Sequence, residues 1–232
     1  MIEFENRVIL VTGAKGGLGS AVTNHFLSIG AKVLGSSKTI ADTDFSNARF
    51  AAIPADLTVA ESAGLLVNGA IRQFGTIDAW VHVMGGFAGG MSIPETTDET
   101  WDLMMNINLR AAFHMLRAIV PQMRQAGRGR IVAIASRQAL EPGAYLSAYN
   151  ASKAALVSLI RTAALENEDL GITANTILPG TMNTEANRKS NPGADGSKWV
   201  QPERVAGVAA FLCSDAAADI TGAAIPVYGN DI

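Results

Sequence analysis

A glycine-rich turn at residues 11–19 constrains the fold of this chain more than any other feature. It follows the short, β-branched apolar run 8–11 and precedes residues 18–29, whose apolar side chains have helical spacing. Glycines allow a tight turn and let a phosphate approach the backbone. The N-terminus of the next helix offers free N–H groups and a partial positive charge. Because the turn joins a strand to a helix, we predict that it binds a nucleotide; a purely structural turn is the alternative.

Strand-like and helix-like segments alternate along the rest of the chain. Apolar, often β-branched runs predict strands at 8–11, 31–35, 50–53, 77–84, 130–135, 171–178 and 223–228. Helical spacing predicts helices at 18–29, 61–74, 101–125, 147–167 and 202–214. Pro121 is expected to interrupt the third of these helices late in its course. The alternation implies right-handed crossovers and an α/β fold, a parallel seven-stranded sheet with helices on both faces. We expect a single domain over residues 1–232, in which the long segment 181–197 is a functional loop.

Composition and charge argue against several other classes of protein. Hydrophobic residues make up 48% of the chain and charged residues 17%, which is typical of a globular core. The net charge of -3 argues against a nucleic-acid partner, and no apolar run reaches the roughly 18 residues of a membrane span. Cys213 is the only cysteine and is expected to be buried. Residues 1–7 include acidic side chains and no apolar signal core, so we expect a cytoplasmic protein with no membrane partner.

The glycine turn has the spacing T-G-x-x-x-G-x-G, and Leu18 lies between its last two glycines. The motif positions are Thr12, Gly13, Gly17 and Gly19. With this motif, and nearly from end to end, the chain resembles the short-chain dehydrogenase/reductase family. The resemblance implies a doubly wound Rossmann fold in which the turn holds a nicotinamide dinucleotide. Relatives are commonly built as dimers or tetramers through two long helices and the last strand, so we expect a homodimer or homotetramer.

The end of the second predicted strand distinguishes NAD from NADP. Ser37 stands where an acidic residue would accept a hydrogen bond from the ribose 2′-hydroxyl and repel a 2′-phosphate. Lys38 follows it, and Lys15 lies near the same ribose in the fold of the family. The two lysines, together with the lack of an acidic residue at the end of this strand, favour NADP(H). Gly16 argues against this preference, because NADP-binding members often carry a base there, and two solvated lysines are the alternative.

Other candidate cofactor contacts follow the later strands. After the third strand, Asp56 and Leu57 resemble the adenine-contacting segment of the family, although Asp56 as a cap of the next helix is an equal alternative. After the fourth strand only Gly85 matches the usual N-N-A-G. His82 precedes it without partners at metal-ligand spacing, so we predict a structural histidine and no metal site. After the sixth strand the resemblance implies cofactor contacts from Pro179, Gly180, Met182 and Thr184.

Tyr149 and Lys153 form the pair that carries the expected chemistry. Their separation of four places both on one face of a helix. A phenol with a pKa of ~10 can donate a proton as a carbonyl is reduced but is a poor base in reverse, and a neighbouring ammonium lowers that pKa. Ser136, thirteen residues before Tyr149, and Asn108 match the other catalytic positions of the family. The resemblance implies that Ser136 polarises the carbonyl and that Asn108 completes a proton relay. It also implies that Tyr149 is the general acid/base and that Lys153 binds the nicotinamide ribose.

The substrate is less constrained than the reaction. We expect an NAD(P)(H)-dependent oxidoreductase acting on a small-molecule ketone, aldehyde or secondary alcohol. The loops at 85–90, 187–195 and 197–199 resemble the dihydropteridine reductase branch of the family, so a pterin-type reductase is one alternative. Ser136, which that branch generally lacks, and Ser37 in place of its NADH-selecting acid depart from the branch. A dinucleotide-binding regulatory or assembly protein without turnover is the other alternative.

Overall fold

The computed structural model describes residues 4–230, so both ends of the domain expected over 1–232 lie outside the described residues. Seven strands form one sheet in the order β3-β2-β1-β4-β5-β6-β7, and every neighbouring pair is parallel. The strands are β1 (Val8–Thr12), β2 (Lys32–Ser36), β3 (Phe50–Ala52), β4 (Ala79–His82), β5 (Gly129–Ile134), β6 (Ile172–Pro179) and β7 (Ala224–Val227). The predicted single-domain α/β fold with a parallel seven-stranded sheet is confirmed.

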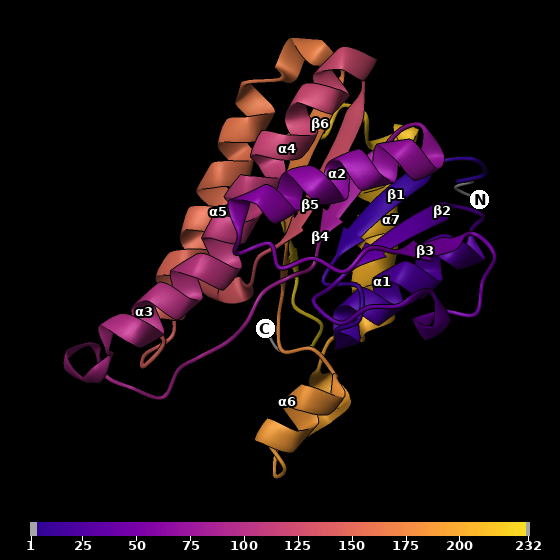
Figure 1. The fold of residues 1–232 in the computed structure, drawn as a ribbon. Helices are drawn as coiled ribbons and strands as arrows, with labels where there is room; N and C mark the ends of the chain where they lie inside the picture. The colour runs from indigo at the N-terminus through magenta and orange to yellow at the C-terminus, as the bar shows by residue number, and fades with distance from the viewer. Residues whose placement is uncertain (1–3, 231–232) are drawn as a thin grey trace.

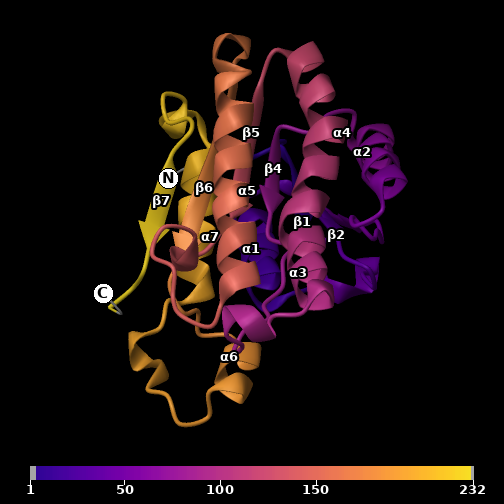
Figure 2. The same ribbon diagram turned by 90° about the vertical axis from the view of Figure 1, so that its left-hand side faces the viewer.

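Helices cover both faces of this sheet, which explains why the central strands are continuously apolar (Figures 1 and 2). One face carries α1 (Gly17–Ser28) and α7 (Pro202–Cys213), which pack against each other. The other face carries α2 (Ala60–Phe74), α4 (Ala111–Ala126) and α5 (Ser147–Leu165). The hydrophobic core therefore has two parts, one on each side of the sheet. Cys213 is buried in the first part, as predicted.

The strand at the far edge of the sheet differs from the central ones. β7 is only partly buried and contains Pro226, which has no N–H to donate to a further strand. The strands β1, β4 and β6 are buried along their whole length. None of the helices in the described part of the chain is long and apolar enough to cross a membrane.

Two helical segments differ from the sequence-based expectation. The third predicted helix begins earlier, as α3 (Asp98–Met105), because the Thr97 hydroxyl accepts from the Thr100 N–H at 3.3 Å and caps it. It continues through a π-helical turn (Asn106–Arg110) into α4. The expected interruption at Pro121 is wrong: α4 runs through the proline and ends at Gly127, whose φ of 64° is left-handed. A proline removes only one backbone hydrogen bond, and the packed face of α4 holds the helix together.

The long segment at 181–197 was expected to be a loop, and that expectation is wrong in part. It contains the short helix α6 (Glu185–Ser190). The Thr184 hydroxyl accepts from the Asn187 N–H at 3.3 Å and so caps the helix. Below the sheet in Figures 1 and 2, α6 lies beyond the carboxyl ends of the strands, where ligands bind in open parallel sheets.

Candidate active site

The glycine turn brings backbone segments so close together that side chains would not fit. A Cβ on Gly13, whose φ is 83°, would lie 2.5 Å from the backbone nitrogen of Met84. A Cβ on Gly19 would lie 1.9 Å from the carbonyl oxygen of Gly13, and one on Gly17 would lie 3.1 Å from the Thr184 side chain. Gly13 and Gly19 are therefore required by close contacts with neighbouring backbone, whereas at Gly17 the Thr184 side chain would have to shift by a few tenths of an ångström. The three motif glycines leave bare backbone at the N-terminus of α1.

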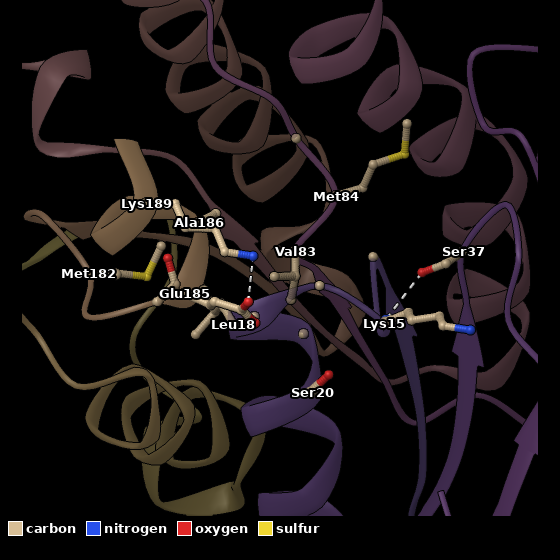
Figure 3. A pocket seen from close by; sticks show the side chains of 16 residues that line it. Lys15, Leu18, Ser20, Ser37, Val83, Met84, Met182, Glu185, Ala186 and Lys189 are labelled. Atoms are coloured by element: carbon tan, nitrogen blue, oxygen red, sulfur yellow. Dashed lines mark hydrogen bonds and ion pairs between the residues drawn. The ribbon is translucent and has the colours of Figure 1, made fainter. Parts of the chain in front are cut away.

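A cavity of about 830 Å³ lies over this turn, between α1 and α6 (Figure 3). It opens where the order of the strands reverses between β1 and β4, at their carboxyl ends. Nine of the residues expected to bind the cofactor line it: Gly13, Lys15, Gly17, Leu18, Gly19, Ser37, Gly85, Met182 and Thr184. The volume and position of the cavity suit a ligand as large as a dinucleotide.

Some lining residues were not among the predicted contacts. They are Ser20, Val83, Met84, Glu185, Ala186 and Lys189, with Gly16 of the turn itself. Lys189 forms an ion pair of 2.6 Å with Glu185, and Figure 3 shows both side chains beside Leu18, opposite Lys15 and Ser37. Only the length of the segment at 181–197 pointed to these α6 residues, because no motif marks them.

Other predicted contacts lie outside the lining of this cavity. Thr12 is buried and its hydroxyl lies 2.8 Å from His82 Nδ1 and accepts from Trp80 Nε1 at 3.1 Å. Leu57 is buried in the core. Gly180 lies against the backbone of the C-terminal segment, where an added Cβ would meet the Tyr228 carbonyl oxygen at 2.9 Å. Pro179 ends the buried strand β6. None of these four positions is among the lining residues of the cavity.

Carboxylates accompany both of the lysines expected at the adenine ribose. Lys15 forms an ion pair of 2.9 Å with Asp44 and donates to the Thr39 carbonyl oxygen at 3.1 Å. Lys38 forms an ion pair of 2.8 Å with Asp56, and this bond and those from Thr58 lower the pKa of Asp56 to about 2. Ser37 brings no acid to the end of β2, as predicted from the sequence, but both lysines are paired with carboxylates from other segments.

Asp56 does not cap the following helix either. Its carboxylate accepts from the backbone N–H of Thr58 at 3.1 Å and from the Thr58 hydroxyl at 2.6 Å. The helix α2 begins later, at Ala60, and Val59 at its N-cap makes no side-chain capping bond. Asp56 thus stabilises a turn before α2 and the side chain of Lys38.

The π-helical turn places Asn108 in the interior, where it joins two segments. Its amide oxygen accepts from the Gly86 N–H at 2.9 Å, and its amide nitrogen donates to the Gly86 carbonyl oxygen at 3.1 Å. The same nitrogen donates to the Ser152 hydroxyl at 3.0 Å. Asn108 therefore fixes the segment after β4 to α5. Such widened helical turns are frequent at functional sites.

Lys153 lies beside Asn108 in the same buried region. Its ammonium group donates to the Ile134 carbonyl oxygen at 3.0 Å, and burial lowers its pKa from the usual 10.5 to about 8. A Cβ on Gly85 would lie 2.8 Å from Asn108 Oδ1 and 3.1 Å from Lys153 Nζ. The side chains of Asn108 and Lys153 thus both lie against Gly85, the one residue after β4 that matches the N-N-A-G motif.

The hydroxyl group of Ser136 lies close enough to that of Tyr149 to influence its pKa. Burial raises the pKa of Tyr149 above its usual 10, and the Ser136 hydroxyl lowers it only in part. This direction is opposite to the one expected from a neighbouring Lys153. Ser136 also accepts from the Gln138 N–H at 3.2 Å, which fixes it at the end of β5. Phe87, in the segment after β4, packs edge-on against the Tyr149 ring.

His82 is fully buried at the end of β4, and burial lowers its pKa to about 3, so it is neutral. Its Nε2 has no hydrogen-bond partner, while its Nδ1 holds the Thr12 hydroxyl and its ring packs against Trp80. Residues 4–230 contain no group of three or more His, Cys, Asp or Glu side chains placed to hold a metal ion. His82 supports the base of the glycine turn.

Comparison with known proteins agrees with this geometry. A family model described as short chain dehydrogenase matches residues 7–195. The chain is 32% identical to human dehydrogenase/reductase SDR family member 4, over 97% of this chain and 87% of that protein. It is also 32% identical to the short-chain dehydrogenase/reductase olcF of Penicillium canescens, over 96% of this chain and 95% of the relative. The crystal structure of levodione reductase superposes with a TM-score of 0.90 at 26% identity, over 98% of both chains.

Proposed function

The chain belongs to the short-chain dehydrogenase/reductase family, and from this premise we propose that it interconverts a ketone or aldehyde and the corresponding alcohol with a nicotinamide dinucleotide. One observation carries the proposal. Asn108, Ser136, Tyr149 and Lys153, which come from three different parts of the sequence, meet around the segment that follows β4, beside the cavity of the glycine turn. The bonds at Ser136 and Asn108 hold these groups in fixed positions before any substrate binds.

The residues of the cavity fit a dinucleotide. When bound, the nicotinamide group supplies or accepts the hydride. The motif glycines leave space for its diphosphate against the backbone. Gly16 caps α1 without a side-chain hydrogen bond, so the first N–H groups of this helix remain available to phosphate oxygens. Thr184 and Met182 form the opposite wall.

Tyr149 acts as the proton donor in the direction of reduction. Its raised pKa keeps the phenol protonated at neutral pH, and Ser136 next to it can bond the same carbonyl oxygen. In the direction of oxidation, the ammonium group of Lys153 favours the phenolate by its positive charge. Asn108 was expected to complete a proton relay. Its bonds to Gly86 and Ser152 support a positioning role, in which it holds the wall of the site.

NADP(H) is the favoured cofactor in this proposal. Lys15 and Lys38 flank Ser37 at the end of β2, and a 2′-phosphate would bond them more strongly than a hydroxyl group does. Both lysines are paired with carboxylates, so the phosphate would have to share them with Asp44 and Asp56. Dissociation constants of NADPH and NADH measured on the same protein distinguish the two cofactors.

A carbonyl substrate is favoured over a pterin. Ser136 is present beside Tyr149, which suits a carbonyl oxygen that accepts from both hydroxyls. The relatives reported above are not described as pterin reductases, and one of the superposed structures is named as a reductase of levodione. A protein without turnover would have no need of the hydroxyl pair in the interior.

We also propose that the protein is a cytoplasmic homodimer or homotetramer. Exposed apolar side chains on the two long helices support the assembly: Phe113 on α4 is 44% exposed and Leu165 on α5 is 65% exposed. Light scattering coupled to size-exclusion chromatography measures the mass that tests it.

The decisive experiment replaces Tyr149 with Phe. This substitution removes the phenolic hydroxyl and keeps the ring, so we expect NAD(P)H-dependent turnover of carbonyl compounds to fall by at least about 100-fold. Dinucleotide affinity, measured by fluorescence titration, should stay within about threefold because Tyr149 lies outside the cavity lining. Tyr228→Phe is the matched control, since Tyr228 lies beside Glu141 and Arg137 and the Arg137 guanidinium packs over its ring. Near-native turnover by Tyr149→Phe would refute the proposed role.

A further inference from the structure

The segment after β4 holds an exposed aromatic ring against Tyr149. The centroids of the Phe87 and Tyr149 rings are 5.0 Å apart, and the ring planes meet at 70°. Tyr149 is half-buried in its site, whereas Phe87 is 67% exposed. Its edge-to-face packing on Tyr149 sets the orientation of the exposed ring. Phe87 therefore presents an apolar surface directly beside the hydroxyl group that would protonate a substrate.

This ring is held in place from both sides. Before it, the paired hydrogen bonds between Asn108 and the backbone of Gly86 fix the chain. After it, the Gly90 N–H donates to the Tyr145 carbonyl oxygen at 2.8 Å. A Cβ on Gly89 would lie 3.2 Å from Phe87 Cζ, so the chain folds closely back over the ring. Because the segment is anchored at both ends, little ordering of the backbone would accompany binding.

We propose that Phe87 determines substrate specificity, and that its ring binds a flat apolar substituent, such as an aryl group, on the carbonyl carbon. This inference rests on the proposed function of the site. Aromatic groups stack edge-to-face or offset on one another with an attraction beyond that of buried area alone, so a flat ring gains more from Phe87 than a small alkyl group does. The substituent covers the part of Phe87 that is now exposed, while its carbonyl oxygen faces Tyr149 and Ser136.

The test compares two methyl ketones, acetophenone and 2-butanone, with saturating NADPH or NADH. In the native protein we expect kcat/KM for acetophenone to exceed that for 2-butanone by at least about tenfold. Phe87→Ala should abolish most of this preference, mainly through a higher KM for acetophenone, and leave the dinucleotide dissociation constant unchanged. Phe87→Trp should keep the preference, because it restores a flat ring. Phe211→Ala is the matched control, since Phe211 is a partly exposed phenylalanine on α7, away from the site.

The ratio of kcat/KM for the two ketones distinguishes a role of Phe87 in substrate specificity from a role in holding the Tyr149 ring in position. If Phe87→Ala lowers kcat/KM for both ketones by the same factor, or changes neither, the inference is wrong. It is also wrong if the native protein binds the dinucleotide and reduces 2-butanone as well as acetophenone, or reduces only carbonyl compounds without a flat group. The proposed function itself would be refuted if the native protein bound neither dinucleotide, or if Tyr149→Phe kept full activity.

Discussion

Lys153 is buried with a positive charge, so the structure predicts that replacing it with methionine stabilises the fold at neutral pH. The ammonium group has one hydrogen bond, to the Ile134 carbonyl oxygen, and the residue as a whole is 5% exposed. An ion in such a position lacks most of its hydration. Methionine has a similar length and no charge, so the substitution removes the unfavourable burial and also removes the hydrogen bond.

The lowered pKa gives the magnitude. The fall from 10.5 to about 8 for Lys153 corresponds to about 3 kcal/mol, at 1.36 kcal/mol for each pKa unit. The native state binds fewer protons than the unfolded state between these two values, so the free energy of unfolding rises as the pH increases from about 8 to 10.5. Below pH 8 the full penalty is present. The lost hydrogen bond offsets about 1 kcal/mol, so Lys153→Met should gain about 2 kcal/mol at pH 7.

The assay is urea unfolding of the protein with Lys153 and of Lys153→Met at several pH values from 7 to 10.5. Both proteins carry Tyr149→Phe in this assay, because the charge of Lys153 also acts on the Tyr149 phenol, so the difference between the two free energies of unfolding isolates Lys153. We expect the protein with Lys153 to gain about 3 kcal/mol relative to Lys153→Met between pH 8 and 10.5. Lys198→Met, a change of an exposed lysine in the segment before α7, should show no such trend.

A difference that stays constant within about 0.5 kcal/mol over this pH range would falsify the reasoning, because it would mean that the Lys153 ammonium group carries no burial penalty. Lys153→Met alone should also lose turnover, so the stabilising change and the loss of function would occur at one residue. Sites that trade stability for activity in this way are common in enzymes.

Two further substitutions test the cofactor site. Gly19→Ala should prevent dinucleotide binding and lower the free energy of unfolding, measured in urea, by about 3 kcal/mol, because its Cβ would meet the Gly13 carbonyl oxygen at 1.9 Å. Gly64→Ala on α2 is the control. Its Cβ would have no atom within 4 Å, so the same titration should show no change or a gain in stability of up to about 1 kcal/mol. Lys38→Met should raise the dissociation constant of NADPH about tenfold and leave that of NADH within about twofold, as measured by fluorescence. Lys38→Met should change the free energy of unfolding by less than about 1 kcal/mol, because the ion pair of Lys38 with Asp56 is largely exposed. An equal rise in the dissociation constants of NADPH and NADH would contradict the assignment of Lys38 to the 2′-phosphate.

The parts of the fold that follow from local pattern were predictable from the sequence. The sheet could be predicted because strands buried on both faces must be continuously apolar, and the glycine turn because only glycine fits its contacts. The helix through Pro121 was not, because the packing of α4 overrides a local preference. α6 was missed because it is a single short turn between polar residues.

The residues that belong to the candidate site were easier to predict from the sequence than the side chains that each of them contacts. The spacing in the sequence predicted that Ser136 and Tyr149 lie together, and the structure places Ser136 near enough to influence the pKa of Tyr149. It gave no sign that Asp56 would pair with Lys38, because two segments from neighbouring strands meet only in the folded sheet. The raised pKa of Tyr149 likewise depends on burial, which a sequence motif does not describe.

The π-helical turn sets the phase of the long helical segment that contains Asn108. Met104 and Met123 are both buried on this segment and are 19 residues apart, which is about 5.3 turns of a regular α-helix and would place them about 100° apart around the axis. One residue absorbed in the turn at Asn106–Arg110 reduces this to about 5.0 turns, so both methionines point to the core. The same phase turns Asn108 inward while the nearby Asn106 stays partly exposed. A regular α-helix that kept all of these residues would therefore turn α4 by about 100° against α3. Removing one residue from the turn would instead keep the two methionines in phase and would change only the local position of Asn108.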